Sequence, residues 1–95
     1  MRRELQILNM LGLHARPASE FVKAVRQFKS DVTICKGNEC FSAASILEVL
    51  SANLDCGSHL VIEAIGPDAV EVLDRLAQLL LEFRDQEGSC RDLAS

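Results

Sequence analysis

Segments of alternating polar and apolar residues are separated along this chain by segments of helical periodicity, and this order constrains the fold more than any other feature. A strand of alternating polarity buries one face, so the helices that follow such strands are expected to cover that face of the sheet. The expected fold class is α+β, with the element order βαββαβα and the helices on one face of a four-stranded sheet. The predicted strands cover residues 4–9, 31–36, 39–41 and 59–65, and the predicted helices cover residues 15–28, 45–53 and 69–83.

A Gly-Asn pair at residues 37–38 separates two of the predicted strands and favours a two-residue hairpin turn. In that register Cys35 lies directly opposite Cys40, close enough for a cross-strand disulfide to be geometrically possible. A reducing cytoplasm favours free thiols, so we expect Cys35 and Cys40 to be unbonded. The other two cysteines, Cys56 and Cys90, lack the paired spacing of a zinc site, so no metal or other cofactor is indicated.

The last predicted helix is followed by a polar C-terminal segment. Asp68 and Glu71 fit a carboxylate variant of the capping box at the start of this helix, whose apolar stripe includes Val70 and Leu80. From residue 84 onward the helical period is lost. We therefore expect one domain over residues 1–83 and a mobile tail over residues 84–95.

The charge distribution argues against a nucleic-acid partner, because the formal net charge is −4. Seven of the ten Lys and Arg residues lie within residues 1–47, so the basic side chains gather in the first half of the chain. No apolar run approaches the ~18 residues that a membrane span needs, and the first residues do not resemble a signal peptide. We expect a soluble, cytoplasmic monomer that binds neither nucleic acid nor a membrane.

The string GLHARPA at residues 12–18 places an imidazole, a guanidinium and a helix start within one turn of chain. Gly12 permits a tight turn, and Pro17 is acceptable in the first helical turn. The backbone N–H groups there, including that of Ala15, lack intrahelical partners and suit an anion. His14 is a nucleophile in its neutral form, and Arg16 adds a fixed positive charge. These residues suit an anion, including a phosphoryl group on the ring. The alternative is that His14 only caps the helix or hydrogen-bonds a carbonyl group, as a lone histidine before a helix usually does.

The longer string GLHARPAS at residues 12–19, together with SIL at residues 45–47, resembles the active-site signature of HPr, the histidine phosphocarrier family of the bacterial phosphoenolpyruvate:sugar phosphotransferase system. The resemblance implies an HPr-like open-faced β-sandwich with an antiparallel sheet. It also implies that His14 accepts a phosphoryl group on Nδ1 from phospho-enzyme I and passes it to an EIIA domain, while Arg16 stabilises the phosphorylated ring. Such a carrier has no turnover of its own.

Two alternatives to the sugar branch remain open. The signature does not separate HPr from the related carrier of the nitrogen-related phosphotransferase branch. A regulatory binding module of the same fold is the second alternative, which is disfavoured because His14, Arg16 and Pro17 are all present.

Ser45 has a structural and a regulatory interpretation. Ser45 and Glu48 form a capping box, in which the hydroxyl accepts from the N–H of Glu48 and the carboxylate accepts from the N–H of Ser45. The resemblance implies instead that an HPr kinase phosphorylates this serine and thereby weakens phosphoryl transfer. Two departures from the family pattern argue against phosphorylation of Ser45. Ala44 stands where the family often has a lysine, and Glu48 would repel a phosphate.

The predicted helix after Ser45 carries a candidate docking surface. Leu47 and Leu50 are three residues apart and are expected to form an exposed apolar patch, with Ile46 beside them. The alternative is that all three belong to the core. Lys23 belongs to a basic face on the helix that follows His14, which would attract acidic partner surfaces. The resemblance implies enzyme I, EIIA domains and an HPr kinase as the partners of this surface.

Overall fold

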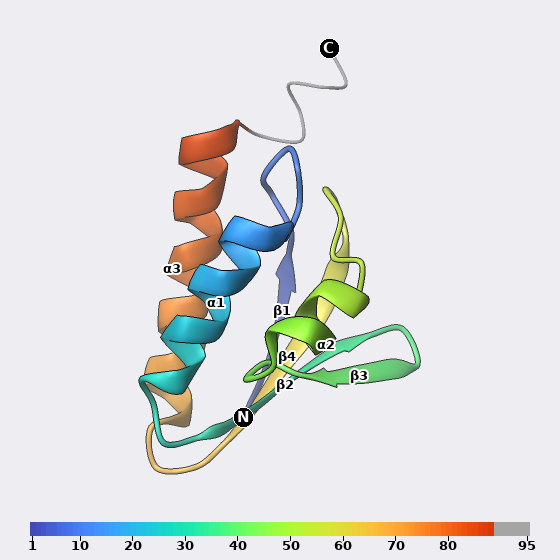
Figure 1. Ribbon diagram of the computed structural model, residues 1–95. Coiled ribbons are helices and arrows are strands. Elements are labelled where there is room, and N and C mark those ends of the chain that lie inside the picture. The colour runs from blue at the N-terminus through green and yellow to red at the C-terminus, as the bar shows by residue number, and fades with distance from the viewer. Residues whose placement is uncertain (89–95) are drawn as a thin grey trace.

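The computed structural model describes residues 1–88 and has the predicted order of elements in that range. Figure 1 shows the helices gathered on one side of a twisted sheet, with α1 and α3 running side by side. The expected α+β open-faced sandwich is therefore confirmed. The elements are β1 (Arg2–Gln6), α1 (Ala15–Arg26), β2 (Asp31–Lys36), β3 (Glu39–Ser42), α2 (Ile46–Ser51), β4 (His59–Ile65) and α3 (Ala69–Glu87).

The sheet has the strand order β1-β4-β2-β3, and every neighbouring pair of strands is antiparallel. The hairpin turn at residues 37–38 sets the register in which Cys35 pairs with Cys40, as predicted. Alternate residues of β4 point into the core, as the period-two pattern requires. The fully buried inward-facing residues of the two central strands include Ile34 and Ile62, which lie directly opposite each other.

The helices cover the sheet with an apolar stripe each. In α1 the stripe includes Phe21, which is fully buried. In α3 the buried residues are Ala69, Val72, Leu73, Leu76, Leu79, Leu80 and Phe83. The prediction that Val70 belongs to this stripe is wrong, since its side chain is 43% exposed. Val70 follows the buried Ala69, and one helical residue turns the side chain by ~100° away from the core.

Cysteine oxidation differs from the expectation of free thiols. Cys35 and Cys40 form a disulfide across the β2–β3 hairpin, and Cys56 is disulfide-bonded as well. The expectation of free thiols, which rested on a reducing cytoplasm, is therefore wrong for these residues. The hairpin register correctly placed Cys35 opposite Cys40, close enough for a disulfide. Directly opposed residues of an antiparallel pair have Cβ atoms near enough for such a bond.

Both ends of α3 differ from the sequence-based prediction. At the start, the Asp68 side chain makes no capping bond and accepts instead from the backbone N–H groups of Lys29 and Ser30, both at 2.9 Å. At the other end, α3 continues through Glu87, so residues 84–87 are helical and not part of a tail. The prediction of a mobile tail otherwise falls on residues 89–95, which lie outside the described residues.

Candidate functional site

The loop between β1 and α1 is held against the segment that follows α2. The backbone N–H of Leu13 donates to the carbonyl oxygen of Leu54 at 2.8 Å. Gly12 has φ +69°, and a Cβ atom built there would lie 2.5 Å from that same oxygen. Only glycine satisfies both the positive φ and this close approach, so Gly12 fixes the position of the loop.

His14 is the N-cap residue of α1, and its backbone oxygen accepts from the N–H of Ala18 at 2.9 Å. Its side chain makes no capping hydrogen bond, so the imidazole does not serve as the helix cap. The side chain is 40% exposed. The ring is therefore accessible to another molecule while its backbone is anchored.

The first turn of α1 offers donors to an anion. Within residues 1–88 the backbone N–H groups of Ala15 and Arg16 make no hydrogen bond, and Pro17 has no N–H. No acidic residue lies in this turn. The Arg16 side chain is exposed and forms no ion pair with any described residue. The sequence-predicted residues His14, Ala15 and Arg16 thus lie together at one helix N-terminus, where the helix dipole also favours negative charge.

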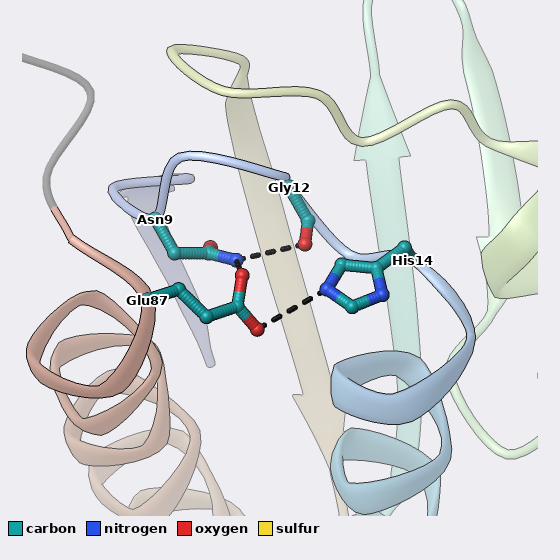
Figure 2. A network of polar contacts seen from close by, with 4 residues as sticks. All are labelled: Asn9, Gly12, His14 and Glu87. Atoms are coloured by element: carbon teal, nitrogen blue, oxygen red, sulfur yellow. Dashed lines mark hydrogen bonds and ion pairs between the residues drawn. The ribbon is translucent and has the colours of Figure 1, made fainter. Parts of the chain in front are cut away.

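Figure 2 shows a polar network that joins this site to the end of α3. One carboxylate oxygen of Glu87 lies 3.1 Å from Nε2 of His14, and the other accepts from Nδ2 of Asn9 at 2.9 Å. The same Nδ2 donates to the carbonyl oxygen of Gly12 at 2.8 Å. The backbone adds a further link, because the N–H of Met10 donates to the oxygen of Gly88 at 2.9 Å. The last turn of α3 is thus part of the His14 site.

Sequence reasoning missed Asn9 and Glu87, although a signal for Glu87 exists. Leu76, Leu80 and Phe83 are separated by four and three residues and lie on the buried face of α3. Four residues later the same face carries Glu87, so the helical period does continue beyond residue 84. A carboxylate at a position where the stripe requires burial indicates a polar partner inside the molecule.

Ser45 lies at the opposite end of α1 from His14. Arg26, the last residue of α1, donates to the carbonyl oxygen of Ala44 from Nη2 at 2.8 Å and from Nε at 3.1 Å. The twelve residues of α1 span ~18 Å, and Ser45 lies beside the end of this helix that is away from His14. The hydroxyl of Ser45 caps α2 by accepting from the N–H of Glu48 at 3.4 Å.

Only half of the predicted capping box forms around Ser45. The carboxylate of Glu48 accepts from the backbone N–H of Ser42 at 3.1 Å and not from that of Ser45. The N–H of Ser45 instead points to the carbonyl oxygen of Ser42, 3.4 Å away, so it is no longer available to Glu48.

Helix α2 presents the predicted apolar patch to solvent. Leu47 is 75% exposed and Leu50 is 37% exposed, and we call these two residues the α2 patch. Ile46 is half-buried and packs against the core, so it is only partly available. Lys23 is exposed on α1, the helix that α2 contacts. The alternative that all three apolar residues belong to the core is therefore wrong for Leu47 and Leu50.

Residues 1–88 contain no group of three or more His, Cys, Asp or Glu side chains arranged to hold a metal ion. Over the same residues, no helix has the length and apolarity needed to cross a membrane. His59 is exposed, and its Nε2 atom lies 3.4 Å from Nε2 of Gln6. In sequence it is far from His14 and the start of α1.

Comparison with known proteins points to one family. Residues 1–82 match the family model described as the phosphorylation site of the PTS HPr component. Phosphocarrier protein HPr of Haemophilus influenzae is 33% identical over 78 residues, which cover 82% of this chain and 92% of that protein. Phosphocarrier protein NPr of Shewanella violacea is 34% identical over 80 residues, covering 84% of this chain and 88% of that protein. The crystal structure of HPr-C-His from Thermoanaerobacter tengcongensis has a TM-score of 0.87 at 31% identity, covering 92% of this chain and 98% of that one.

Proposed function

The chain belongs to the HPr family of phosphocarrier proteins of the phosphotransferase system, and we propose that it accepts a phosphoryl group on His14 from phospho-enzyme I and passes it to an EIIA domain. As a member of this family it is a carrier and not an enzyme with turnover of its own. The observation that carries the proposal is the position of His14, a partly exposed imidazole beside the first, unpaired N–H groups of α1.

The neighbours of His14 account for acceptance and release of the phosphoryl group. A phosphoryl group on the ring would lie near the N–H groups of Ala15 and Arg16, which are already oriented by the helix. Arg16 would add a charge-assisted hydrogen bond from an exposed side chain. Because these groups are few and accessible to solvent, the phosphoryl group is stabilised without being enclosed, which permits onward transfer.

We assign partner docking to the α2 patch together with Ile46 and Lys23. The α2 patch supplies apolar area, and Lys23 supplies positive charge for acidic partner surfaces. Enzyme I and the EIIA domain must use this surface in turn, so each complex is expected to be transient. We further propose that the protein works in the cytoplasm and that it is a monomer. Light scattering of the purified chain tests the monomeric state.

The experiment that tests acceptance uses the chain, enzyme I, Mg²⁺ and phosphoenolpyruvate. We expect intact mass spectrometry to detect one acid-labile phosphate on the wild-type chain and none on His14→Ala. An equal phosphate yield on His14→Ala would contradict the assignment of His14 as the acceptor.

The nitrogen-related branch is the second candidate, because NPr of Shewanella violacea is as similar to this chain as HPr of Haemophilus influenzae. Enzyme I of the sugar branch and enzyme I of the nitrogen branch, tested in parallel at equal concentration, separate the two. Faster phosphorylation by the sugar-branch enzyme supports the proposal, and faster phosphorylation by the other enzyme supports the alternative. A regulatory binding module predicts no phosphate from either.

Regulation through Ser45 is a separate proposal, in which an HPr kinase phosphorylates the N-cap hydroxyl of α2. The guanidinium of Arg26 lies at the carbonyl of Ala44, next to Ser45, and supplies positive charge where the family often has a lysine. Glu48 opposes the added charge in the same helical turn. Incubation with HPr kinase and ATP tests this proposal, because an acid-stable phosphate should appear on the wild-type chain and be absent from Ser45→Ala.

A further inference from the structure

We propose that Glu87 is a positioning residue for phosphoryl transfer, which holds the imidazole of His14 in the tautomer that leaves Nδ1 free to attack. The inference rests on the proposed function, since it assigns a role within the phosphoryl site. It concerns a residue of α3 that is 73 positions away from His14 in sequence.

The geometry identifies which ring nitrogen carries the hydrogen. Nε2 of His14 lies 3.1 Å from a carboxylate oxygen of Glu87. An ionised carboxylate only accepts hydrogen bonds, so the contact is favourable only when Nε2 carries the hydrogen. In the neutral ring the other nitrogen then holds the lone pair. Figure 2 shows this second nitrogen on the side of the ring that faces away from Glu87.

Glu87 is itself held in place, which a positioning residue must be. Its second oxygen accepts from Nδ2 of Asn9, a residue that is fully buried. The Glu87 side chain is only 19% exposed, against 40% for that of His14. The helix end is further tied to the loop by the bond from the N–H of Met10 to the oxygen of Gly88. Both carboxylate oxygens of Glu87 are therefore engaged, and the end of α3 that carries them is anchored. The side chain has little freedom to move away from the imidazole of His14.

The transfer step balances without any proton leaving the ring. The lone pair of Nδ1 forms a bond to phosphorus, and the bond from phosphorus to the donor breaks, its electron pair remaining on the donor. The hydrogen stays on Nε2, so the phosphorylated ring gains positive charge while it faces Glu87. The neutral hydrogen bond thereby becomes charge-assisted, which stabilises the product ring. Transfer to the next acceptor reverses these changes and restores the same tautomer.

Substitution by glutamine gives a sharp test because it preserves the length of the side chain. If the amide oxygen of Glu87→Gln accepts from Asn9, the amide NH₂ group donates to Nε2 of His14 and forces the hydrogen onto Nδ1. The alternative orientation would place two donors, from Asn9 and from the glutamine, against each other. We therefore expect this variant to invert the tautomer and Glu87→Ala to give a mixture.

The first readout is the ring itself, observed by two-bond ¹⁵N–¹H correlation NMR of ¹⁵N-histidine-labelled chain at mildly alkaline pH. We expect the wild-type spectrum to show the tautomer with hydrogen on Nε2, and Glu87→Gln to show the tautomer with hydrogen on Nδ1. His14→Ala identifies the signal, since His59 is the other histidine of the chain. A wild-type ring with hydrogen on Nδ1, or a Glu87→Gln ring unchanged from wild type, overturns the inference.

The second readout is the rate of phosphorylation by enzyme I and phosphoenolpyruvate. We expect Glu87→Gln and Glu87→Ala to be slowed roughly 10–100-fold, the effect of removing the carboxylate that orients a metal-ligating histidine, which serves as the analogy. Asp85→Asn is the matched control, because Asp85 lies in the same turn of α3 and contacts Arg84, not His14. Wild-type rates for both Glu87 variants overturn the inference.

The two readouts separate this inference from the function on which it rests. Tautomer inversion in Glu87→Gln with an unphosphorylated wild-type chain would refute the proposed function and support the assignment of Glu87 as the residue that orients the ring. Normal phosphorylation of the wild-type chain and of both Glu87 variants would support the function and refute the positioning role. Thermal unfolding of each variant shows that a changed rate is not a loss of fold.

Discussion

The backbone N–H of Leu13 donates to the carbonyl oxygen of Leu54 at 2.8 Å, which joins the loop that carries His14 to the segment that follows α2. Helix α2 also contacts α1 directly. The α2 patch therefore has a fixed position relative to His14. A partner that docks on α2 is thereby placed with a defined orientation toward His14, which favours transfer between the two proteins.

Leu47→Ala should weaken docking and leave the fold intact. The side chain is 75% exposed, so its removal costs little core packing, whereas truncation of a residue that anchors an interface weakens binding by more than ~1 kcal/mol. We expect the KM for this chain as substrate of enzyme I to rise about tenfold. Leu81→Ala is the control, since Leu81 is a 37% exposed leucine on α3, outside the proposed surface. Equal KM values for the two variants would remove α2 from the docking surface.

Arg16→Ala should slow phosphorylation and shorten the lifetime of the phosphorylated ring. Arg16 forms no ion pair with any other described residue, so its removal changes the site more than the fold. A hydrogen bond to a charged group contributes about 1.5–3 kcal/mol, which corresponds to roughly a 10–100-fold change in rate. Lys29→Ala removes the same charge elsewhere and should behave as wild type. A normal transfer rate in Arg16→Ala would contradict the electrostatic role given to this residue.

Asp68 should contribute to stability in a pH-dependent manner. The hydroxyl of Ser30 and then the backbone N–H of Lys29 donate to its carboxylate and lower the pKa of Asp68 from the ordinary value of 3.8. A lowered pKa in the folded state means that the contribution is present above pH ~4 and is lost as the pH falls through the folded-state pKa. Asp68→Asn should therefore destabilise the chain most at neutral pH. Urea unfolding of both chains at pH 7 and pH 3 tests this, and an equal difference at the two pH values would contradict it.

The disulfide between Cys35 and Cys40 should stabilise the fold modestly. It closes a loop of five positions, for which the chain-entropy relation gives about 2 kcal/mol. We expect Cys35→Ser/Cys40→Ser to unfold at lower urea than wild type under oxidising conditions and at the same urea concentration in excess reductant. Thiol titration of the denatured, non-reduced wild-type chain checks the premise, since a free thiol at either position would contradict the bond.

The features of the fold that depend on local periodicity could be predicted from the sequence. Period-two alternation predicts the inward-facing residues of β4, and a Gly-Asn turn sets the register of the β2–β3 hairpin. The helix start at Ala15 follows from the glycine, histidine and proline around it. Each of these depends on a few neighbouring residues whose backbone preferences agree.

The partners of polar side chains could not be predicted in the same manner, because they depend on distant parts of the chain. Asp68 caps its own helix in the sequence pattern, yet in the fold it accepts from residues 29 and 30 of a preceding loop. The polar residues and lost helical period from residue 84 onward predict that Glu87 lies in a tail. In the fold, Asn9 donates to one of its carboxylate oxygens and His14 contacts the other. The residues that surround His14 thus come from two distant segments, the loop before α1 and the end of α3. Only the first of these segments carries a recognisable motif.

The central claim is that His14 both accepts and donates a phosphoryl group, and a pulse–chase experiment tests it most directly. The chain is charged with labelled phosphoenolpyruvate and enzyme I, separated from both, and then mixed with an unlabelled EIIA domain. We predict that the label moves to the EIIA domain in equal amount while the chain returns to its unphosphorylated mass, and that His14→Ala carries no label at any stage. Label that stays on the wild-type chain, or that appears on His14→Ala, would contradict the account.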